Sequence, residues 1–335
     1  VAHEMPCTVF DVGDHLALAA DGRTLISHGA DGDRSVVSVY DVMQGLVMRN
    51  LRGHRAAVQC VAVGGDLVVS GDTDGSILLW SLSSGALRAE LHAAGSKAHA
   101  RDVFGLAMEG TLLVSGSHDG TLKVWNLETS QNITTLRGHQ GGVNGVHLTG
   151  DGGVASAGQD RTARVWLLDG STTCTHTFDH PAKVYSVCAS GDLVVSGCQD
   201  GGVRLFSRQT GKVFRQLDGH RSWCNTVRLL GPLLVSGSTD STVKVWALDG
   251  TTEPVASLEA HTNMVLGVAI SPTNGRLASL GQDGKLFVWK ASAAPSLSIP
   301  PHDVQTQPSA SLPSSSFSSA SKSKAPVKKM KKKKG

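Results

Sequence analysis

The sequence predicts an all-β protein, a seven-bladed β-propeller followed by a disordered C-terminal tail. An aromatic residue recurs seven times at intervals of 40 to 45 residues, and a turn rich in Gly and Asp stands before each of them. A short run rich in β-formers stands before each turn. Repeats of this length built from short β-rich runs are typical of propeller blades. The seven aromatic residues are Tyr40, Trp80, Trp125, Trp166, Phe206, Trp246 and Trp289.

Each repeat contains short runs that we expect to form four strands. In the second repeat these runs are VQCVAV, DLVVSG, SILLW and ALRAEL. Runs of this kind, bounded by Gly, Asp and Ser, are strand signals. One small sheet cannot bury both of its faces, but seven sheets stacked around an axis cover one another. The pattern therefore predicts one propeller domain over residues 1–290 and a separate tail over residues 291–335.

The last repeat has only three such runs and ends with FVWK at Phe287–Lys290. A further β-rich run, Cys7–Val12, precedes the first repeat. We expect this N-terminal run to complete the last blade, because a shared blade would close the ring and remove an open sheet edge. The chain begins with Val1, so either the initiator methionine has been removed or the sequence is a fragment without its upstream part.

Composition favours an intracellular protein. No stretch of about 18 apolar residues is present, so no membrane span is expected. The first residues lack the basic and apolar parts of a signal peptide. Six cysteines occur, none in a C-x-x-C pair. Buried, reduced thiols are the favoured interpretation, with disulfides or a zinc site as the alternatives.

The net charge of +3 is distributed unevenly. Residues 291–335 hold eight Lys and one Asp, whereas the preceding residues hold 23 basic and 27 acidic side chains. We therefore expect a mildly acidic propeller that carries a basic appendage.

Two segments carry a resemblance to a known family. They are GSHDGTLKVW at Gly116–Trp125 and GSTDSTVKVW at Gly237–Trp246, and Gly-His pairs such as Gly138-His139 precede several turns. These motifs resemble the WD-repeat (WD40) family over about residues 7–290. The resemblance implies a propeller that binds other macromolecules. The chain departs from the family pattern because Ser81, Asn126, Leu167, Ala247 and Lys290 replace the Asp of the Trp-Asp pair, and Phe206 replaces a Trp.

The resemblance also implies a hydrogen-bonded tetrad inside each blade. In such a tetrad Asp accepts from His, His bonds the Ser hydroxyl, and Ser accepts from the Trp indole. A buried polar group left unpaired costs about 1–3 kcal/mol, so these bonds stabilise the blade. Phe206 has no N–H group that could donate to Ser196. We therefore expect the fifth blade, with His180, Ser196 and Asp200, to be less stable than the others. The expected tetrads are His54, Ser70, Asp74 and Trp80; His99, Ser115, Asp119 and Trp125; His139, Ser156, Asp160 and Trp166; His220, Ser236, Asp240 and Trp246; and His261, Ser279, Asp283 and Trp289.

The same residue types make up a Ser-His-Asp catalytic triad. An enzyme needs one activated nucleophile beside one oxyanion hole, not five copies around a ring. We therefore predict that the protein is not an enzyme and has no catalytic residue. The pair His92 and His99 lies in LHAAGSKAHA, which we interpret as a flexible insertion rather than a metal site. No G-x-x-x-x-G-K-[ST] phosphate loop occurs, and we predict no cofactor, metal or small-molecule substrate.

Partner binding is expected on the face that carries the loops after the conserved histidines, since the family uses this face. We carry the family's binding positions over to this chain by taking the residues three and five positions after each conserved His. Exposed aromatic and Met side chains among polar neighbours are typical of interface hot spots, although the same side chains can turn inward as packing. The expected partner-binding residues are Gln59, Phe104, Asn144, Tyr185, Trp223, Asn225, Met264 and Leu266.

Three functions stay open. The first is a non-catalytic scaffold or adaptor in a multiprotein complex. The second is a nuclear or nucleolar RNA-associated assembly factor of the ribosome-biogenesis type. The third is the substrate-recognition subunit of a ubiquitin ligase, because the short turns have some likeness to F-box/WD proteins. Against the third, the residue before each turn Asp is Thr, His or Gln, never the phosphate-gripping Arg of those receptors.

The tail is rich in Ser, Pro and Lys and is expected to be disordered. Its basic run predicts either a nuclear import signal, which an importin binds, or a segment that binds RNA and other polyanions. The predicted location is the nucleus or nucleolus, with the cytoplasm as the alternative. The basic residues are Lys328, Lys329, Lys331, Lys332, Lys333 and Lys334.

Overall fold

The computed structural model describes residues 16–19, 23–28, 34–41, 44, 46–93, 95–170, 172–270 and 276–290. Within these ranges the chain forms seven antiparallel blades and no helix, which confirms the predicted fold class. None of the described elements is a helix long and apolar enough to span a membrane. Residues 291–335, and with them the predicted basic tail, lie outside the described residues.

The first two strands of each blade form its inner half. The innermost strands are β1 (Leu16–Leu18), β5 (Val58–Gly64), β11 (Val103–Glu109), β15 (Val143–Leu148), β19 (Val184–Ser190), β23 (Cys224–Leu230) and β27 (Val265–Ile270). The second strands are β2 (Thr24–His28), β6 (Leu67–Asp72), β12 (Leu112–Ser117), β16 (Gly153–Gly158), β20 (Leu193–Cys198), β24 (Leu233–Ser238) and β28 (Arg276–Gly281).

The remaining strands form the outer half. The third strands are β3 (Val36–Asp41), β7 (Ile77–Ser81), β13 (Thr121–Asn126), β17 (Thr162–Leu167), β21 (Val203–Ser207), β25 (Val243–Ala247) and β29 (Leu286–Lys290). The outermost strands are β4 (Leu46–Arg52), β8 (Leu87–Glu90), β14 (Gln131–Arg137), β18 (Cys174–Asp179), β22 (Val213–Leu217) and β26 (Ala256–Leu258).

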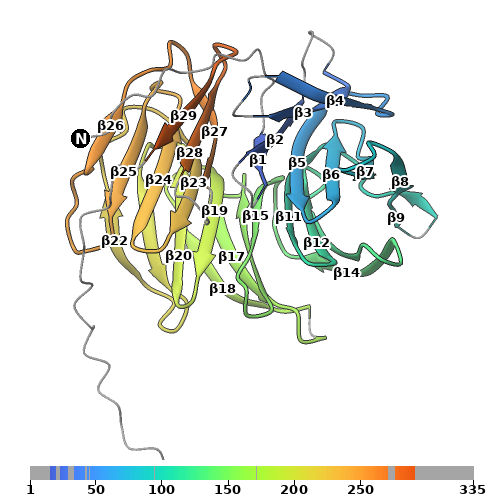
Figure 1. Cartoon of the computed structure of the whole chain (residues 1–335). Helices are drawn as coiled ribbons and strands as arrows, with labels where there is room; N and C mark the ends of the chain where they lie inside the picture. The colour runs from blue at the N-terminus through green and yellow to red at the C-terminus, as the bar shows by residue number, and fades with distance from the viewer. Residues whose placement is uncertain are drawn as a thin grey trace, which may run out of the picture. The chain divides into compact units, whose positions relative to one another are not determined.

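The innermost strands face one another around a central channel. Each is in contact with the innermost strand of the next blade, and β1 touches both β5 and β27, so the ring is closed. Figure 1 shows β1, β11, β15 and β19 near the middle and β4, β8, β22 and β26 toward the periphery. The seventh sheet has three described strands, β27, β28 and β29. The predicted closing strand, Cys7–Val12, lies outside the described residues.

The core lies between blades and is organised by the repeated tryptophans. Trp125 packs with Ile77 and Leu79 of the preceding blade, and Trp166 packs with Val114 and Leu122 of the blade before it. Burying an aromatic side chain of this size removes a large apolar area from water. Since each Trp fills the seam to its neighbour, the repeat period sets the spacing of the core.

One segment differs from its predicted structure. LHAAGSKAHA was expected to be a flexible insertion, but its strands β9 (His92–Ala93) and β10 (Ser96–Lys97) form a hairpin. The strand β9 pairs in parallel with β14 and thereby extends the third blade. The open edge of a sheet offers unpaired N–H and C=O groups, and this hairpin satisfies part of that edge.

Candidate protein-binding face

The third blade shows the complete tetrad. The indole N–H of Trp125 donates to Oγ of Ser115 at 2.9 Å, and the Ser115 hydroxyl lies 2.7 Å from Nε2 of His99. Nδ1 of His99 lies 2.9 Å from Oδ2 of Asp119. Burial lowers the pKa of His99, which keeps its imidazole neutral. Burial alone would raise the pKa of Asp119, but hydrogen bonds led by that of His99 hold it well below its usual range.

Three further blades repeat this chain of bonds with His–Asp, His–Ser and Trp–Ser distances between 2.7 and 3.1 Å. Their residues are His139, Ser156, Asp160 and Trp166; His220, Ser236, Asp240 and Trp246; and His261, Ser279, Asp283 and Trp289.

The second blade differs from the prediction in its carboxylate. Nδ1 of His54 lies 2.9 Å from Oδ2 of Asp72, not from Asp74. The second blade reads GDTDG, where the third reads GSHDG, so Asp72 occupies the position of Ser117. From there its other oxygen also accepts from the backbone N–H groups of Asp74 and Ser76. Asp74 points away and forms an exposed ion pair with Lys97. The assignment of Asp74 to the tetrad is therefore wrong.

The fifth blade lacks both ends of the tetrad. Nε2 of His180 lies 2.7 Å from Oγ of Ser196, but Nδ1 donates to the carbonyl of Phe178 at 2.9 Å. Asp200, expected beside His180, instead forms two hydrogen bonds with Arg204. Phe206 packs against Phe178 with ring centroids 4.5 Å apart. Apolar packing and an ion pair thus replace two polar links of the other blades.

The tetrads leave no accessible nucleophile. The tetrad serines Ser70, Ser115, Ser156, Ser236 and Ser279 all have 0% exposure. Their hydroxyls are shared between an imidazole and an indole, so no space remains for a substrate. Among the described residues, no group of three or more His, Cys, Asp or Glu side chains is arranged to hold a metal ion.

A β-bulge recurs in six innermost strands and positions the candidate binding residues. In β5, for example, Val58 and Cys60 pair with consecutive residues of β6, which leaves Gln59 unpaired between them. Such bulges redirect a side chain out of the regular sheet. The six bulged residues are Gln59, Phe104, Asn144, Tyr185, Asn225 and Leu266.

We call the face that carries the loops 55–57, 100–102, 140–142, 181–183, 221–223 and 262–264 the upper face. Five of the bulged residues line one cavity of about 110 Å³ where the central channel opens on this face. Gln59 is half-buried and lies outside this lining, as does Met264. The five lining residues are Phe104, Asn144, Tyr185, Asn225 and Leu266.

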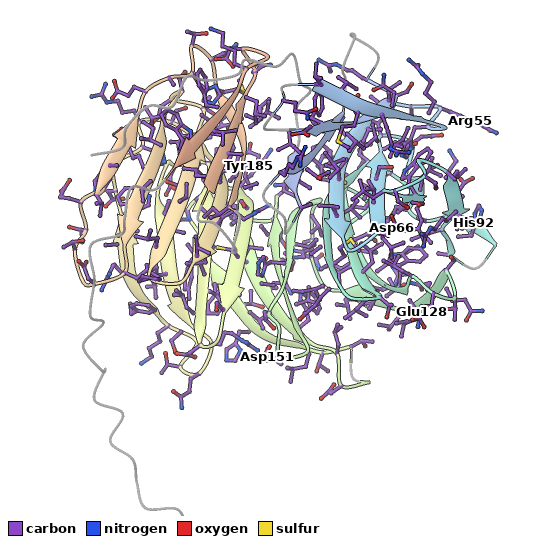
Figure 2. All side chains as sticks on the ribbon, viewed as in Figure 1. Arg55, Asp66, His92, Glu128, Asp151 and Tyr185 are labelled. Carbon is purple, nitrogen blue, oxygen red and sulfur yellow. The ribbon has the colours of Figure 1, made fainter. Side chains whose placement is uncertain are left out.

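Two aromatic stacks flank the channel mouth. Trp223, which is 43% exposed, stacks on Tyr185 with ring centroids 5.4 Å apart and ring planes 16° apart. Phe104 stacks on His118 at 4.0 Å. Figure 2 shows Tyr185 and Arg55 toward one end of the propeller, with Glu128 and Asp151 toward the other. The upper face thus presents flat apolar surfaces beside a polar opening.

The two asparagines at the mouth also join neighbouring blades. Nδ2 of Asn144 donates to the carbonyl of Val184 at 2.8 Å, and Nδ2 of Asn225 donates to that of Val265 at 2.9 Å. These bonds fix the bulges of adjacent strands relative to each other. The rigid mouth is a consequence of these links, since neither side chain is free to rotate.

The sequence interpretation missed Arg228, which lines the channel below the mouth. An Arg inside the apolar run CNTVRLL was the available signal, because a strand buried in a ring does not ordinarily hold an isolated charge.

The chain matches the family model described as WD domain, G-beta repeat, at residues 45–81, 94–126, 130–166, 172–207, 211–247 and 252–290. These six matches correspond to blades that contain a conserved His. The family model does not match the first blade, which has no Gly-His pair; its repeat, which ends at Tyr40, is seen in the sequence and in strands β1–β4 of the structure.

Curated relatives share this repeat. The DENN domain and WD repeat-containing protein SCD1 of Arabidopsis thaliana is 28% identical over 288 residues, covering 80% of this chain and 23% of that protein. The Ribosome biogenesis protein WDR12 homolog of Chlamydomonas reinhardtii is 37% identical over 110 residues, or 29% of this chain and 24% of that protein. The Periodic tryptophan protein 2 homolog of Neurospora crassa is 32% identical over 112 residues, which are 32% of this chain and 12% of that protein.

The chain therefore spans about a quarter or less of the length of these relatives. The likeness lies in the repeats, and the repeats cover more than half of this chain. With its closed ring of seven blades and its repeated His–Ser–Trp hydrogen bonds, the chain belongs to the WD-repeat family of β-propellers.

Proposed function

We propose that this propeller is a non-catalytic scaffold that holds a partner protein on its upper face, around the channel mouth. WD-repeat propellers are typically protein-interaction scaffolds. The observation that carries the proposal is the stack of Trp223 on Tyr185. A tryptophan exposed at 43% on the rim of a cavity contributes little to the core, yet Trp and Tyr dominate interface hot spots.

The matched variants Trp223→Ala and Phe214→Ala test this proposal. Both aromatic side chains are exposed, but Phe214 lies on the outermost strand β22, away from the mouth. Affinity purification from cells followed by mass spectrometry should lose the main partner with Trp223→Ala and retain it with Phe214→Ala. Thermal melting of both variants should stay close to that of the parent chain. Retention of all partners by Trp223→Ala at full stability would contradict the proposal.

A second proposed function is assembly of ribonucleoprotein in the nucleus or nucleolus through the basic tail. The support is the run Lys328–Lys334 together with the partial likeness to the Ribosome biogenesis protein WDR12 homolog. Contacts of lysines with phosphates weaken steeply as salt rises, whereas apolar contacts do not. Partners of the tail should therefore be released by a high-salt wash, and partners of the upper face should remain.

Deleting Lys328–Lys334 separates these functions further. Loss of nuclear accumulation of a tagged chain would support an import signal, and an unchanged distribution would argue against it. Recovery of ubiquitin-ligase subunits in the same purification, dependent on Trp223, would support the remaining alternative, a substrate receptor.

A further inference from the structure

Among the described residues that line the two cavities of the central channel, Arg228 is the one Arg or Lys, and Glu109, in the larger cavity, is the one carboxylate. Arg228 lines both the cavity of about 110 Å³ at the upper mouth and a larger cavity of about 460 Å³ below it. All other residues that line the upper cavity are neutral, among them Asn144, Tyr185 and Leu266. The guanidinium of Arg228 therefore sets the charge of the upper cavity.

The position of Arg228 in its strand is occupied by small or neutral side chains in other blades. In β23, Val227 pairs with Ser236 of the second strand, and Arg228 is the next residue. The equivalent residue of each other blade follows the one that pairs with the equivalent Ser, which is Ser27 in the first blade. A ring defined by register thus contains four alanines, one cysteine, one histidine and one arginine. Its members are Ala17, Ala62, Ala107, His147, Cys188, Arg228 and Ala269.

The guanidinium has little compensation for its position. Nη1 of Arg228 donates to the carbonyl of Val227 at 2.9 Å, and no described carboxylate lies within ion-pair distance. Its neighbours in the ring are His147 and Cys188. Both are neutral at pH 7, because burial lowers the pKa of His147 to about 4 and raises that of Cys188 to about 12. Burial also lowers the pKa of Arg228 itself. Arg228 is half-buried, and a charge held away from bulk water without a partner destabilises a fold, so such positions are characteristic of functional sites.

Four exposed cations also lie on the upper face around the mouth. They form no ion pair within the described part of the chain. The same face also carries Asp102, which lies 3.9 Å from Nδ1 of His118, and the turn carboxylates that bind tetrad histidines, Arg204 or Lys97. Exposed cations that have no partner of their own attract an oppositely charged group. The four cations are Arg55, Arg101, Lys183 and Arg221.

We infer that the upper mouth receives an acidic peptide segment of the partner, with one Asp or Glu side chain inserted so that its carboxylate pairs with Arg228. A guanidinium binds a carboxylate through two parallel hydrogen bonds, and the donors of Arg228 other than the one bound to Val227 are available for this pairing. Among the described residues that line the upper cavity Arg228 is the one charged group, so one inserted carboxylate neutralises it, whereas an inserted phosphate dianion would keep one negative charge without a partner inside the cavity. The flanking residues of the peptide would lie across Trp223 and Phe104. This inference rests on the proposed role of the upper face.

Selection of peptides from a random displayed library on the full chain tests the inference. We expect the selected peptides to share one Asp or Glu position. A synthetic peptide with Glu at that position should bind at least about tenfold more tightly than its Gln twin, since hydrogen bonds to charged groups have that strength. Arg228→Gln should remove this difference. Arg137→Gln, a change on the exposed outer strand β14, is the matched control and should preserve it.

A variant with reversed charge distinguishes a loss of binding from a loss of folding. Arg228→Glu, verified by its melting transition, should shift the selected position from Asp or Glu to Lys or Arg. Binders that depend on Trp223 but share no acidic position, and that bind Arg228→Gln equally well, would overturn the inference and leave the proposed function intact. Tighter binding of a phosphoserine twin than of the Glu peptide would also overturn it, in favour of a phosphorylated partner. Binders indifferent to Trp223 and Arg228 alike would contradict both proposals.

Discussion

Oδ2 of Asp72 lies 2.9 Å from Nδ1 of His54 inside the second blade. This carboxylate comes from the last residue of strand β6, whereas the other tetrad carboxylates come from the turn that follows the second strand. The hydrogen-bond chain therefore depends on where an oxygen lies in space rather than on a fixed place in the repeat.

Asp72→Asn should destabilise the propeller, and Asp74→Asn should have almost no effect. Asp72 is nearly fully buried and accepts from His54 and two backbone N–H groups, so a neutral amide would leave donors unpaired at about 1–3 kcal/mol. Asp74 has only an exposed ion pair with Lys97, and such pairs contribute about 0–1 kcal/mol. Urea unfolding of the two variants side by side is the measurement. Equal losses would restore Asp74 to the tetrad.

Ser115→Ala should cost more stability than Ser196→Ala. The Ser115 hydroxyl joins His99 and Trp125, so its removal leaves a buried imidazole nitrogen and a buried indole N–H without partners. Ser196 bonds only His180 among these groups, because Phe206 has no N–H. We expect a difference of about 1 kcal/mol, the typical value of one net hydrogen bond. Chemical denaturation reports it, and a larger loss in Ser196→Ala would contradict the assignment of bonds.

Stability should fall as the pH is lowered from about 6.5 to about 4. Burial lowers the pKa of both His147 and His180 from 6.5 to about 4. In this interval the unfolded chain binds protons at these histidines and the folded chain does not, so protonation favours unfolding. The urea midpoint measured across this range should decline with falling pH.

The variant His147→Gln should flatten that decline, since one of the protons taken up on unfolding is removed. His180 is unchanged and should maintain part of the slope. His92→Gln, at an exposed position in the β9–β10 hairpin, is the control and should follow the parent curve. An unaltered slope in His147→Gln would show that its imidazole is protonated equally in both states.

Cys174 should react with iodoacetamide before the other described cysteines. Cys60, Cys188, Cys198 and Cys224 are buried, and burial raises the pKa of the Cys188 thiol to about 12, so the reactive thiolate is scarce at pH 8. Cys174 is half-buried at the start of β18. Peptide mapping by mass spectrometry follows each site, and all cysteines should react alike in urea. Modification of Cys188 as fast as Cys174 in the native chain would indicate that the blades open readily.

The period of the chain was sufficient to predict the architecture. An aromatic such as Trp125 or Trp166 recurs wherever one blade must fill the seam to the next, and this demand is local and repeated. The bulged positions could likewise be found by counting from each conserved His, because the six blades that contain this His have the same register between their first two strands. The sequence also indicated that Phe206 would interrupt the hydrogen-bond chain of its blade.

Tertiary structure alone decided which groups meet. Whether Asp72 or Asp74 reaches His54 depends on where strand β6 ends, and Asp200 turns to Arg204 because a guanidinium lies four residues away on the adjacent strand. The isolation of Arg228 emerges only when seven strands from distant parts of the chain surround one axis. Repeat spacing reports short-range order along the chain, whereas charge pairing and cavities depend on distances between blades that no local pattern encodes.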